Sequence, residues 1–259
     1  MRVLVSGAAG GIGEGIVRAL LGGGATVFAT SRSEERLAEL RERIAPEMRP
    51  ALTGIAGDAG DFAGAAEIVA RVEALGGAEA AVAILGRGWW TSGPLLELEP
   101  GEWKAVLDEM LASHFAFARA VIPMLSRRTG SMYLSIGGGA AFEPMPDAGL
   151  VSIAAAGQVM LTRVLAREIG AAAPRIVEIV VDGPVNTRES REFAQPNWIG
   201  DADIGRAVAE LVLHGAVTWE SARTNGPLIV MSERGKRPQP KNVENPDPRA
   251  TRGNARGDR

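Results

Sequence analysis

The sequence predicts one α/β domain in which seven parallel strands form a doubly wound sheet with helices on both faces. Two observations predict this fold. Short β-branched or apolar runs alternate with longer stretches of helical period along residues 2–181, as parallel strands joined by helices do. In addition, nothing in residues 1–231 resembles a linker between two domains, so we expect a single layered domain there.

The expected elements follow one another in regular alternation. We expect strands near residues 2–6, 25–30, 51–56, 80–85, 131–136, 175–181 and 227–231. We expect helices near residues 11–22, 33–44, 61–75, 100–127 (broken), 150–170 and 201–214.

Residues 232–259 differ in composition from the rest of the chain. They hold eight Lys or Arg and four Asp or Glu residues, and almost no apolar residue. Such a segment cannot bury a core, so we expect a flexible basic tail. A solubilising end is the favoured interpretation because no periodicity is present, and an arm that docks on an acidic partner is the alternative.

The composition excludes several kinds of chemistry. The 259 residues include no Cys and only two His residues, His114 and His214, so we expect no disulfide, no thiolate chemistry and no metal site. The net charge of −3 gives no sign of nucleic-acid binding. The sequence shows no apolar run of about 20 residues and no signal-peptide pattern, so we expect no membrane span and a cytoplasmic location.

A glycine-rich turn, SGAAGGIG, follows the first predicted strand and precedes the first predicted helix at residues 6–13. A helix start offers free N–H groups and the positive end of a dipole, and glycines let the backbone approach an anion closely. The junction therefore predicts a site for the pyrophosphate of a dinucleotide. A tight turn without a ligand is the alternative.

The spacing of Gly7, Gly11 and Gly13 resembles the GxxxGxG motif of the short-chain dehydrogenase/reductase family, which has a Rossmann fold. The resemblance extends over residues 1–231, and further motifs fall in order. The segments 161–168 and 224–226 resemble the family's helix after the active site and the TG before its last strand.

The resemblance implies a set of cofactor-binding residues. Asp58 is expected at the adenine, Gly86 is the glycine kept from the family's NNAG, and Thr187 of a PGxxxT-like segment is expected at the nicotinamide carboxamide. The full set is Gly7, Ala9, Gly11, Ile12, Gly13, Ser31, Arg32, Asp58, Gly86, Gly183, Val185 and Thr187.

The end of the second predicted strand favours NADP(H) over NAD(H). An NAD site places a carboxylate there to bind the ribose 2′-hydroxyl, whereas this chain has Ser31 followed by Arg32. A guanidinium can pair with a 2′-phosphate through two donors. The alternative is that Arg32 and Arg36 are solvated charges at a helix start.

The resemblance also implies where catalytic residues are missing. The family's asparagine, serine, tyrosine and lysine positions fall on Met110, Gly137, Val151 and Ala155. No shift of register restores them, because Tyr133, the only tyrosine, lies within the fifth predicted strand and no lysine occurs between residues 105 and 235.

Several other side chains are candidates for this site. Ser135 should share a strand face with Gly137. His114, Glu109 and Glu143 are possible substitute acids, but a structural or solvated role is favoured for each. The pair Trp89-Trp90 is interpreted either as an aromatic wall of the cleft or as a cover for the sheet edge.

We therefore expect an NADP(H)-binding, non-standard oxidoreductase that transfers hydride to a pre-activated small-molecule acceptor without the Tyr/Lys pair. The alternative is a catalytically silent subunit or NADP(H) sensor that partners an active relative, and a lyase or isomerase is a minor third. Small residues crowd positions 152–157. The resemblance implies that this helix pairs with another subunit, in a homo-oligomer or a hetero-oligomer with a relative, and packing within one chain is the alternative.

Overall fold

The computed structural model describes residues 1–86, 93–218 and 223–232. The Trp89-Trp90 pair and nearly all of the predicted tail lie outside these residues, so the structure does not bear on either prediction.

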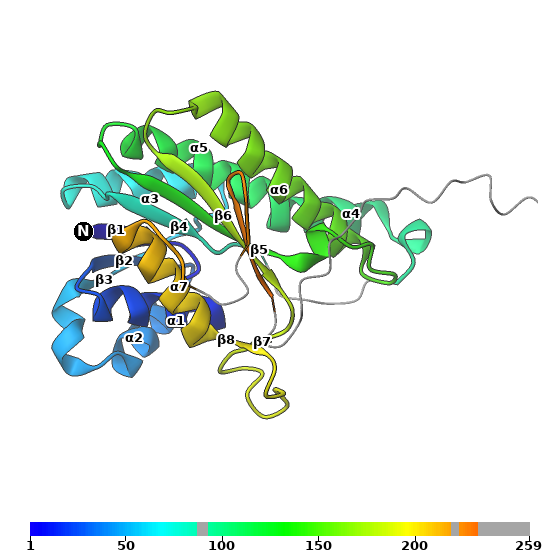
Figure 1. Cartoon of the computed structure of the whole chain (residues 1–259), viewed down its shortest axis with the longest axis horizontal. Coiled ribbons are helices and arrows are strands. Elements are labelled where there is room, and N and C mark those ends of the chain that lie inside the picture. The colour runs from blue at the N-terminus through cyan, green and yellow to red at the C-terminus, as the bar shows by residue number, and fades with distance from the viewer. Residues whose placement is uncertain (87–92, 219–222, 233–259) are drawn as a thin grey trace, which may run out of the picture.

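A single large sheet forms the centre of the domain, with strand order β3-β2-β1-β4-β5-β6-β10-β9 (Figure 1). The parallel strands are β1 (Arg2–Val5), β2 (Thr26–Ser31), β3 (Leu52–Ala56), β4 (Ala80–Ala83), β5 (Met132–Gly138), β6 (Arg175–Asp182) and β10 (Leu228–Ser232). The seven expected strands are thus confirmed, each within about two residues of its expected ends.

Three short strands were not expected. β9 (Arg223–Asn225) adds an antiparallel edge to β10, so one connection differs from the purely parallel sheet that the sequence predicts. β7 (Val185–Asn186) and β8 (Ile199–Gly200) pair with each other outside the large sheet. Segments of two or three residues are too short to show a periodic pattern.

Helices cover both faces of the sheet, as expected (Figure 1). One face carries α1 (Gly11–Gly22), α2 (Glu34–Arg43) and α7 (Asp201–His214). The other carries α3 (Phe62–Ala74), α5 (Ser113–Leu125) and α6 (Gly149–Ile169), with α4 (Pro100–Leu107) beside α6. The connections also contain the short helices η1 (Pro46–Ala51), η2 (Leu95–Glu97), η3 (Asp108–Ala112) and η4 (Gly139–Ala141).

The central strands are apolar because both of their faces are buried. In β1, Val3 and Val5 pack with α1 and α7, whereas Leu4 between them packs with α3 and α5. All three side chains are fully buried. This alternation divides the core into two layers, one on each face of the sheet.

The break expected within residues 100–127 is real. α4 and α5 are separated by η3, a single π-helical turn over Asp108–Ala112, and the hydroxyl of Ser113 donates to the carbonyl of Glu109 at 2.7 Å. Single π turns are frequent at functional sites. Met110 lies at the centre of this turn.

Helix α6 bears on the expectation that the chain has no membrane span. In the part of the chain that the structure describes, it is the one helix long and apolar enough to cross a membrane by length and composition. It packs on the sheet, however, through buried residues such as Leu150, Ala154 and Val159. The core helices of soluble proteins meet the same criterion, so the finding is weak support for a membrane span.

Candidate functional site

The carboxyl ends of the parallel strands meet along one edge of the sheet, where α/β folds bind their ligands. Gly7 follows β1, Gly86 lies three residues after β4, Gly137 lies near the end of β5 and Gly183 follows β6. The sequence-predicted residues at these four strand ends therefore lie along one edge.

The glycine-rich turn between β1 and α1 needs glycine for steric reasons at two positions. Gly7 has φ of +61°, and a Cβ there would overlap the carbonyl oxygen of Ile84 beyond β4. A Cβ on Gly13 would overlap the carbonyl oxygen of Gly7. The turn can thus pack directly on the end of β4, and α1 can start close above it.

The start of α1 has the geometry of an anion site. Its N-cap, Gly10, is extended and supplies no side-chain cap among the described residues. A Cβ on Gly11 would lie 2.5 Å from Oε2 of Glu189 and 2.6 Å from Cβ of Thr187. Glycine therefore leaves room at the helix start, as a pyrophosphate site requires, and the side chains of Glu189 and Thr187 occupy that room in this structure.

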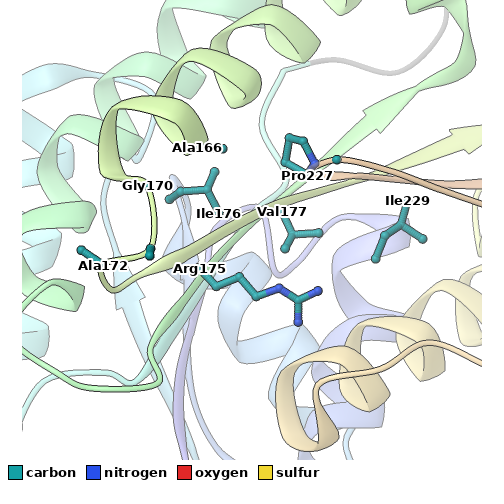
Figure 2. A pocket seen from close by; sticks show the side chains of 10 residues that line it. Ala166, Gly170, Ala172, Arg175, Ile176, Val177, Pro227 and Ile229 are labelled. Carbon is teal, nitrogen blue, oxygen red and sulfur yellow. The ribbon is translucent and has the colours of Figure 1, made fainter.

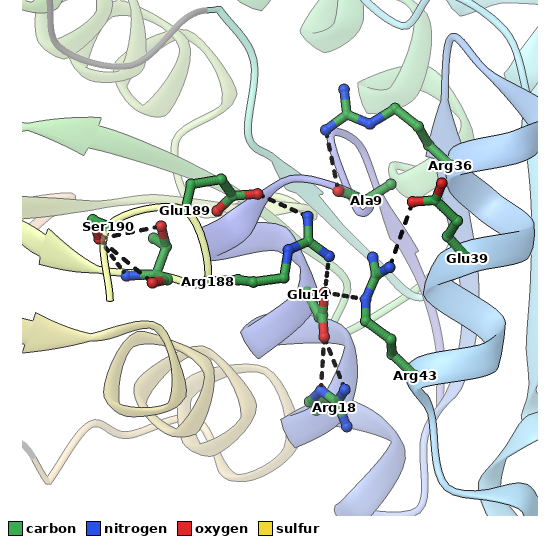
Figure 3. A network of polar contacts seen from close by, with 10 residues as sticks. Ala9, Glu14, Arg18, Arg36, Glu39, Arg43, Arg188, Glu189 and Ser190 are labelled. Carbon is green, nitrogen blue, oxygen red and sulfur yellow. Dashed lines mark hydrogen bonds and ion pairs between the residues drawn. The ribbon is translucent and has the colours of Figure 1, made fainter. Parts of the chain in front are cut away.

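A network of ion pairs holds the segment after β7 against α1 (Figure 3). Arg188 donates to Glu14 at 3.2 Å and to Glu189 at 2.8 Å. Glu14 also accepts from Arg18 at 2.8 Å and from Arg43 at 2.9 Å. Burial alone would raise the pKa of Glu14, but the hydrogen bonds from Arg18 and Arg43 outweigh it and lower that pKa. The sequence interpretation missed this network.

The expected adenosine side of the site lies at the ends of β2 and β3. The carbonyl of Ser31 accepts from the N–H of Gly57 at 3.0 Å, which places Asp58 beside the end of β2. Asp58 is exposed, and its Oδ1 accepts from the N–H of Gly60 at 2.9 Å. Arg32 is also exposed.

The neighbouring Arg36 links this side to the glycine-rich turn. Its guanidinium donates to the carbonyl oxygen of Ala9 at 3.3 Å (Figure 3). The interpretation of Arg36 as a purely solvated charge at a helix start is therefore incomplete.

The remaining cofactor candidates line the same edge. Thr187 lies over Gly11, and its N–H donates to Ser190 Oγ at 2.8 Å. Val185 pairs with Ile199 in the small sheet, which fixes the chain after Gly183. Ile12 is half-buried in the first turn of α1.

The four positions that the resemblance implies for catalysis lie on the elements that line this edge. A Cβ on Gly86 would lie 3.4 Å from both Cα and Cγ of Met110. Val151 and Ala155 are both buried on α6. Tyr133 lies deep in the core, where burial and the negative charge of Glu178 raise its pKa.

The substitute acids weighed from the sequence differ in their surroundings. His114 is buried, and desolvation lowers its pKa to about 4 despite a hydrogen bond with the backbone of Leu85. A pKa near 4 makes the imidazole neutral at pH 7. Glu143 is exposed and Glu109 is half-buried in the π turn. Ser135 shares a strand face with Gly137, as expected, but its hydroxyl is hydrogen-bonded to the hydroxyl of Thr162, with 3.3 Å between the two oxygens.

Two acidic side chains at this edge were missed by sequence reasoning. Glu189 lies over the start of α1, and nothing in its local sequence marks it. Glu178 lies fully buried on β6. A signal for Glu178 was present, because it is the one charged residue inside the apolar run IVEIVV of residues 176–181.

Two further features lie outside this edge. A pocket of about 350 Å³ opens at the amino ends of β6 and β10, the opposite edge of the sheet, between Gly170, Arg175 and Pro227 (Figure 2). Arg175 donates there to the carbonyl of Gly215 at 3.2 Å. Among the described residues, no three His, Cys, Asp or Glu side chains are grouped as around a metal ion.

Known proteins share both the sequence pattern and the fold. The model of a family described as enoyl-(acyl carrier protein) reductase matches residues 7–214. A 2,3-dihydroxy-2,3-dihydro-p-cumate dehydrogenase from Pseudomonas putida is 36% identical over 167 residues, which span 64% of this chain and 63% of that relative, under two thirds of its length. The 3-oxoacyl-[acyl-carrier-protein] reductase FabG of Salmonella typhimurium is 25% identical over 88% of this chain and 97% of its own.

Solved structures agree in fold. A short-chain type dehydrogenase/reductase from Mycobacterium ulcerans superposes with a TM-score of 0.77 at 20% identity, over 89% of this chain and 88% of that chain. An NADPH-bound short-chain oxidoreductase from Pseudomonas aeruginosa PAO1, which contains an atypical catalytic center, superposes with a TM-score of 0.75 at 24% identity, over 92% and 97% of the two chains. With the family match over residues 7–214, the fold and the glycine-rich turn show that this chain belongs to the short-chain dehydrogenase/reductase family.

Proposed function

We propose that this protein is an NADP(H)-dependent oxidoreductase that transfers hydride without the family's tyrosine and lysine. The observation that carries the proposal is the glycine-rich start of α1. Its N-cap, Gly10, makes no side-chain cap hydrogen bond, and a Cβ on Gly7, Gly11 or Gly13 would overlap neighbouring atoms. This is the surface that a pyrophosphate needs.

The residues around this start fit NADP(H). Ser31 ends β2 without a carboxylate, and the exposed Arg32 can pair with a 2′-phosphate through two donors. Asp58 would accept from the adenine, and Thr187 would hold the carboxamide. NADPH is bound in the Pseudomonas aeruginosa structure, and NADP is bound in ElxO, a neighbour at 15% identity with a TM-score of 0.75.

When bound, the reduced nicotinamide supplies a hydride. The residues at the tyrosine and lysine positions, Val151 and Ala155, have no proton to give. A positioned acid contributes a factor of about 10² to 10⁴ to such reactions, so we propose a small acceptor that is already activated. The atypical catalytic center of the Pseudomonas aeruginosa protein supports a departure of this kind.

A second candidate is a catalytically silent subunit or NADP(H) sensor that partners an active relative. One face of α6 favours it, because Ile153, Met160 and Val164 are 38%, 55% and 44% exposed. Phe115 of α5 is also exposed at 44%. Exposed apolar side chains grouped in this way mark interaction surfaces. We therefore propose a homo-oligomer or a hetero-oligomer through α5 and α6, in the cytoplasm.

Interior packing accounts for part of the small-residue stretch on α6. A Cβ on Gly157 would lie 2.8 Å from Cδ2 of Leu111 in the π turn. Packing within one chain, the alternative interpretation of this stretch, therefore explains Gly157. The exposed face described above remains for a partner.

Titration of NADPH fluorescence with the purified protein tests the proposal, with NADH measured in parallel. We expect saturable binding that is tighter for NADPH. Consumption of NADPH with an iminium or activated enone acceptor supports the enzyme, and binding without turnover supports the silent subunit. If neither nucleotide binds, both candidates are wrong.

A further inference from the structure

A buried acid lies directly below the edge where the candidate site opens. Glu178 is fully buried on β6. Neither carboxyl oxygen has a partner with hydrogen-bond geometry among the described residues, although the hydroxyls of Thr162 and Ser135 lie near enough to favour its charged form. Its strand neighbours Val177 and Ile179 pack with the α1 and α7 layer, so Glu178 faces α6. An unpaired buried polar group costs about 1–3 kcal/mol and needs an explanation.

The side chain of Glu178 points toward the candidate site. Its backbone lies opposite Ser135, two residues before Gly137 on β5. A Cβ on Gly137 would nevertheless overlap Oε1 of Glu178. The side chain of Glu178 therefore extends along the sheet toward the edge formed by the C-terminal ends of the strands. Its carboxyl group fills a space that is free only because residue 137 is glycine. Gly137 itself is half-buried.

Polar groups of β5 and α6 surround this carboxyl group. The hydroxyls of Ser135 and Thr162 bond each other at 3.3 Å. The amide of Gln158 donates to the carbonyl of Ile136 at 3.0 Å and lies 3.2 Å from the point that a Cβ on Gly137 would occupy. Oε1 of Glu178 and the amide nitrogen of Gln158 therefore both lie beside the open side of Gly137.

The electrostatic setting suits a group that exchanges a proton near neutral pH. Burial raises the pKa of Glu178 to about 7, against the opposing influence of Thr162, of the positive charge of Arg163 on α6 and of Ser135. Tyr133 is the other titratable group on the facing strand. An acid whose pKa lies near the working pH is the most effective proton donor.

We propose that Glu178 is the proton donor of this site and acts across Gly137 on the oxygen of a bound carbonyl compound. The inference rests on the proposed function and extends its substrate class from pre-activated acceptors to aldehydes and ketones. The hydride forms the new C–H bond, the carbonyl π pair moves to oxygen, and the Glu178 O–H bond breaks as its proton passes to that oxygen. The carboxylate then recovers a proton from solvent.

The titration of the acid can be measured without any substrate. Infrared difference spectra of wild type against Glu178→Gln should show the carbonyl band of a protonated carboxyl group that disappears with a midpoint near pH 7. Gly137→Ala should shift that midpoint, because the added methyl group must displace the carboxyl. A carboxyl group that stays protonated above pH 9 or is ionised below pH 5 would overturn the inference.

The kinetic arm uses NADPH and the activated dicarbonyl 9,10-phenanthrenequinone. Glu178→Gln should lose about 10²- to 10⁴-fold in kcat and should lose the limb of the pH profile near 7, with the NADPH Kd unchanged within about twofold. Glu67→Gln, an exposed carboxyl on α3, is the matched control and should match wild type. Unchanged kcat and pH profile in Glu178→Gln would overturn the inference alone, whereas wild type that binds no NADPH would overturn the proposed function as well.

Discussion

Oε2 of Glu189 lies 2.5 Å from the point that a Cβ on Gly11 would occupy. A carboxylate thus reaches the positive end of α1, where a pyrophosphate would bind. Arg188 holds it there by bonding both Glu189 and Glu14. A bound pyrophosphate would therefore have to displace the carboxylate of Glu189.

Removal of this charge should strengthen cofactor binding. We expect Glu189→Gln to lower the NADPH Kd by about two- to fivefold, as estimated from the 0.3–1 kcal/mol that a charge near a helix end contributes. Titration calorimetry at low salt measures the change. Glu192→Gln, which removes an equal charge from an exposed site nearby, should have no such effect. A higher NADPH Kd in Glu189→Gln would show that the carboxylate of Glu189 does not compete with the pyrophosphate.

The glycine-rich turn should tolerate little change at Gly7. In Gly7→Ala, the backbone φ of +61° would be strained and the new Cβ would overlap the carbonyl oxygen of Ile84. We therefore expect the free energy of unfolding to fall by about 1–3 kcal/mol or more. Gly22→Ala, with nothing within 4 Å at the end of α1, should leave stability unchanged or raise it by up to about 1 kcal/mol. Urea unfolding at pH 7 compares the two, and equal stabilities would contradict this account of the turn.

The stability of the fold should depend on pH through Glu178. Below about pH 4.5 the group is protonated in both the folded and the unfolded state. As the pH rises to about 7 the unfolded state releases the proton while the folded state retains it, because burial raises the folded pKa to about 7, so stability falls and then levels off. The difference between 4.5 and 7 corresponds to about 3 kcal/mol.

Glu178→Gln stays neutral and should escape this loss. Its advantage over wild type in the free energy of unfolding should grow by about 3 kcal/mol between pH 4.5 and pH 8. Urea unfolding across this range measures it. Parallel curves for the two proteins would show that Glu178 titrates alike in both states.

Arg32 should set the choice between the two nicotinamide cofactors. Hydrogen bonds to a charged group contribute about 1.5–3 kcal/mol each, so Arg32→Ala should raise the NADPH Kd by about 10- to 100-fold and leave the NADH Kd nearly unchanged. Arg206→Ala on α7 removes an exposed arginine elsewhere and serves as control. Equal losses for both cofactors would mean that Arg32 does not contact the 2′-phosphate.

The order of elements and most of the edge could be predicted from the sequence. Val3, Leu4 and Val5 form a continuous apolar run because β1 is buried on both faces, and such a run is visible in any sequence. A break within residues 100–127 was expected as well, although the sequence did not place it at Met110. The strand β9 could not be predicted, since its three residues are held by pairing with β10 rather than by their own preference.

The acidic residues at the site show where sequence reasoning stops. Arg188 and Glu14 are 174 residues apart, and no local pattern relates them. Gly137 stands where the family has a serine, and the sequence alone indicates only that a catalytic hydroxyl is missing. In the structure, the carboxyl group of Glu178 on the neighbouring strand occupies the space that a side chain at position 137 would fill.

The sequence by itself determined the α/β fold, the strand that leads into the glycine-rich turn and the lack of a tyrosine and lysine at the catalytic positions, because local residue order encodes periodicity and spacing. Only the tertiary structure decided that Glu178 reaches Gly137 and that Glu189 reaches Gly11. Both contacts depend on which distant segments pack side by side, and pairing of that kind follows from the closure of the whole core.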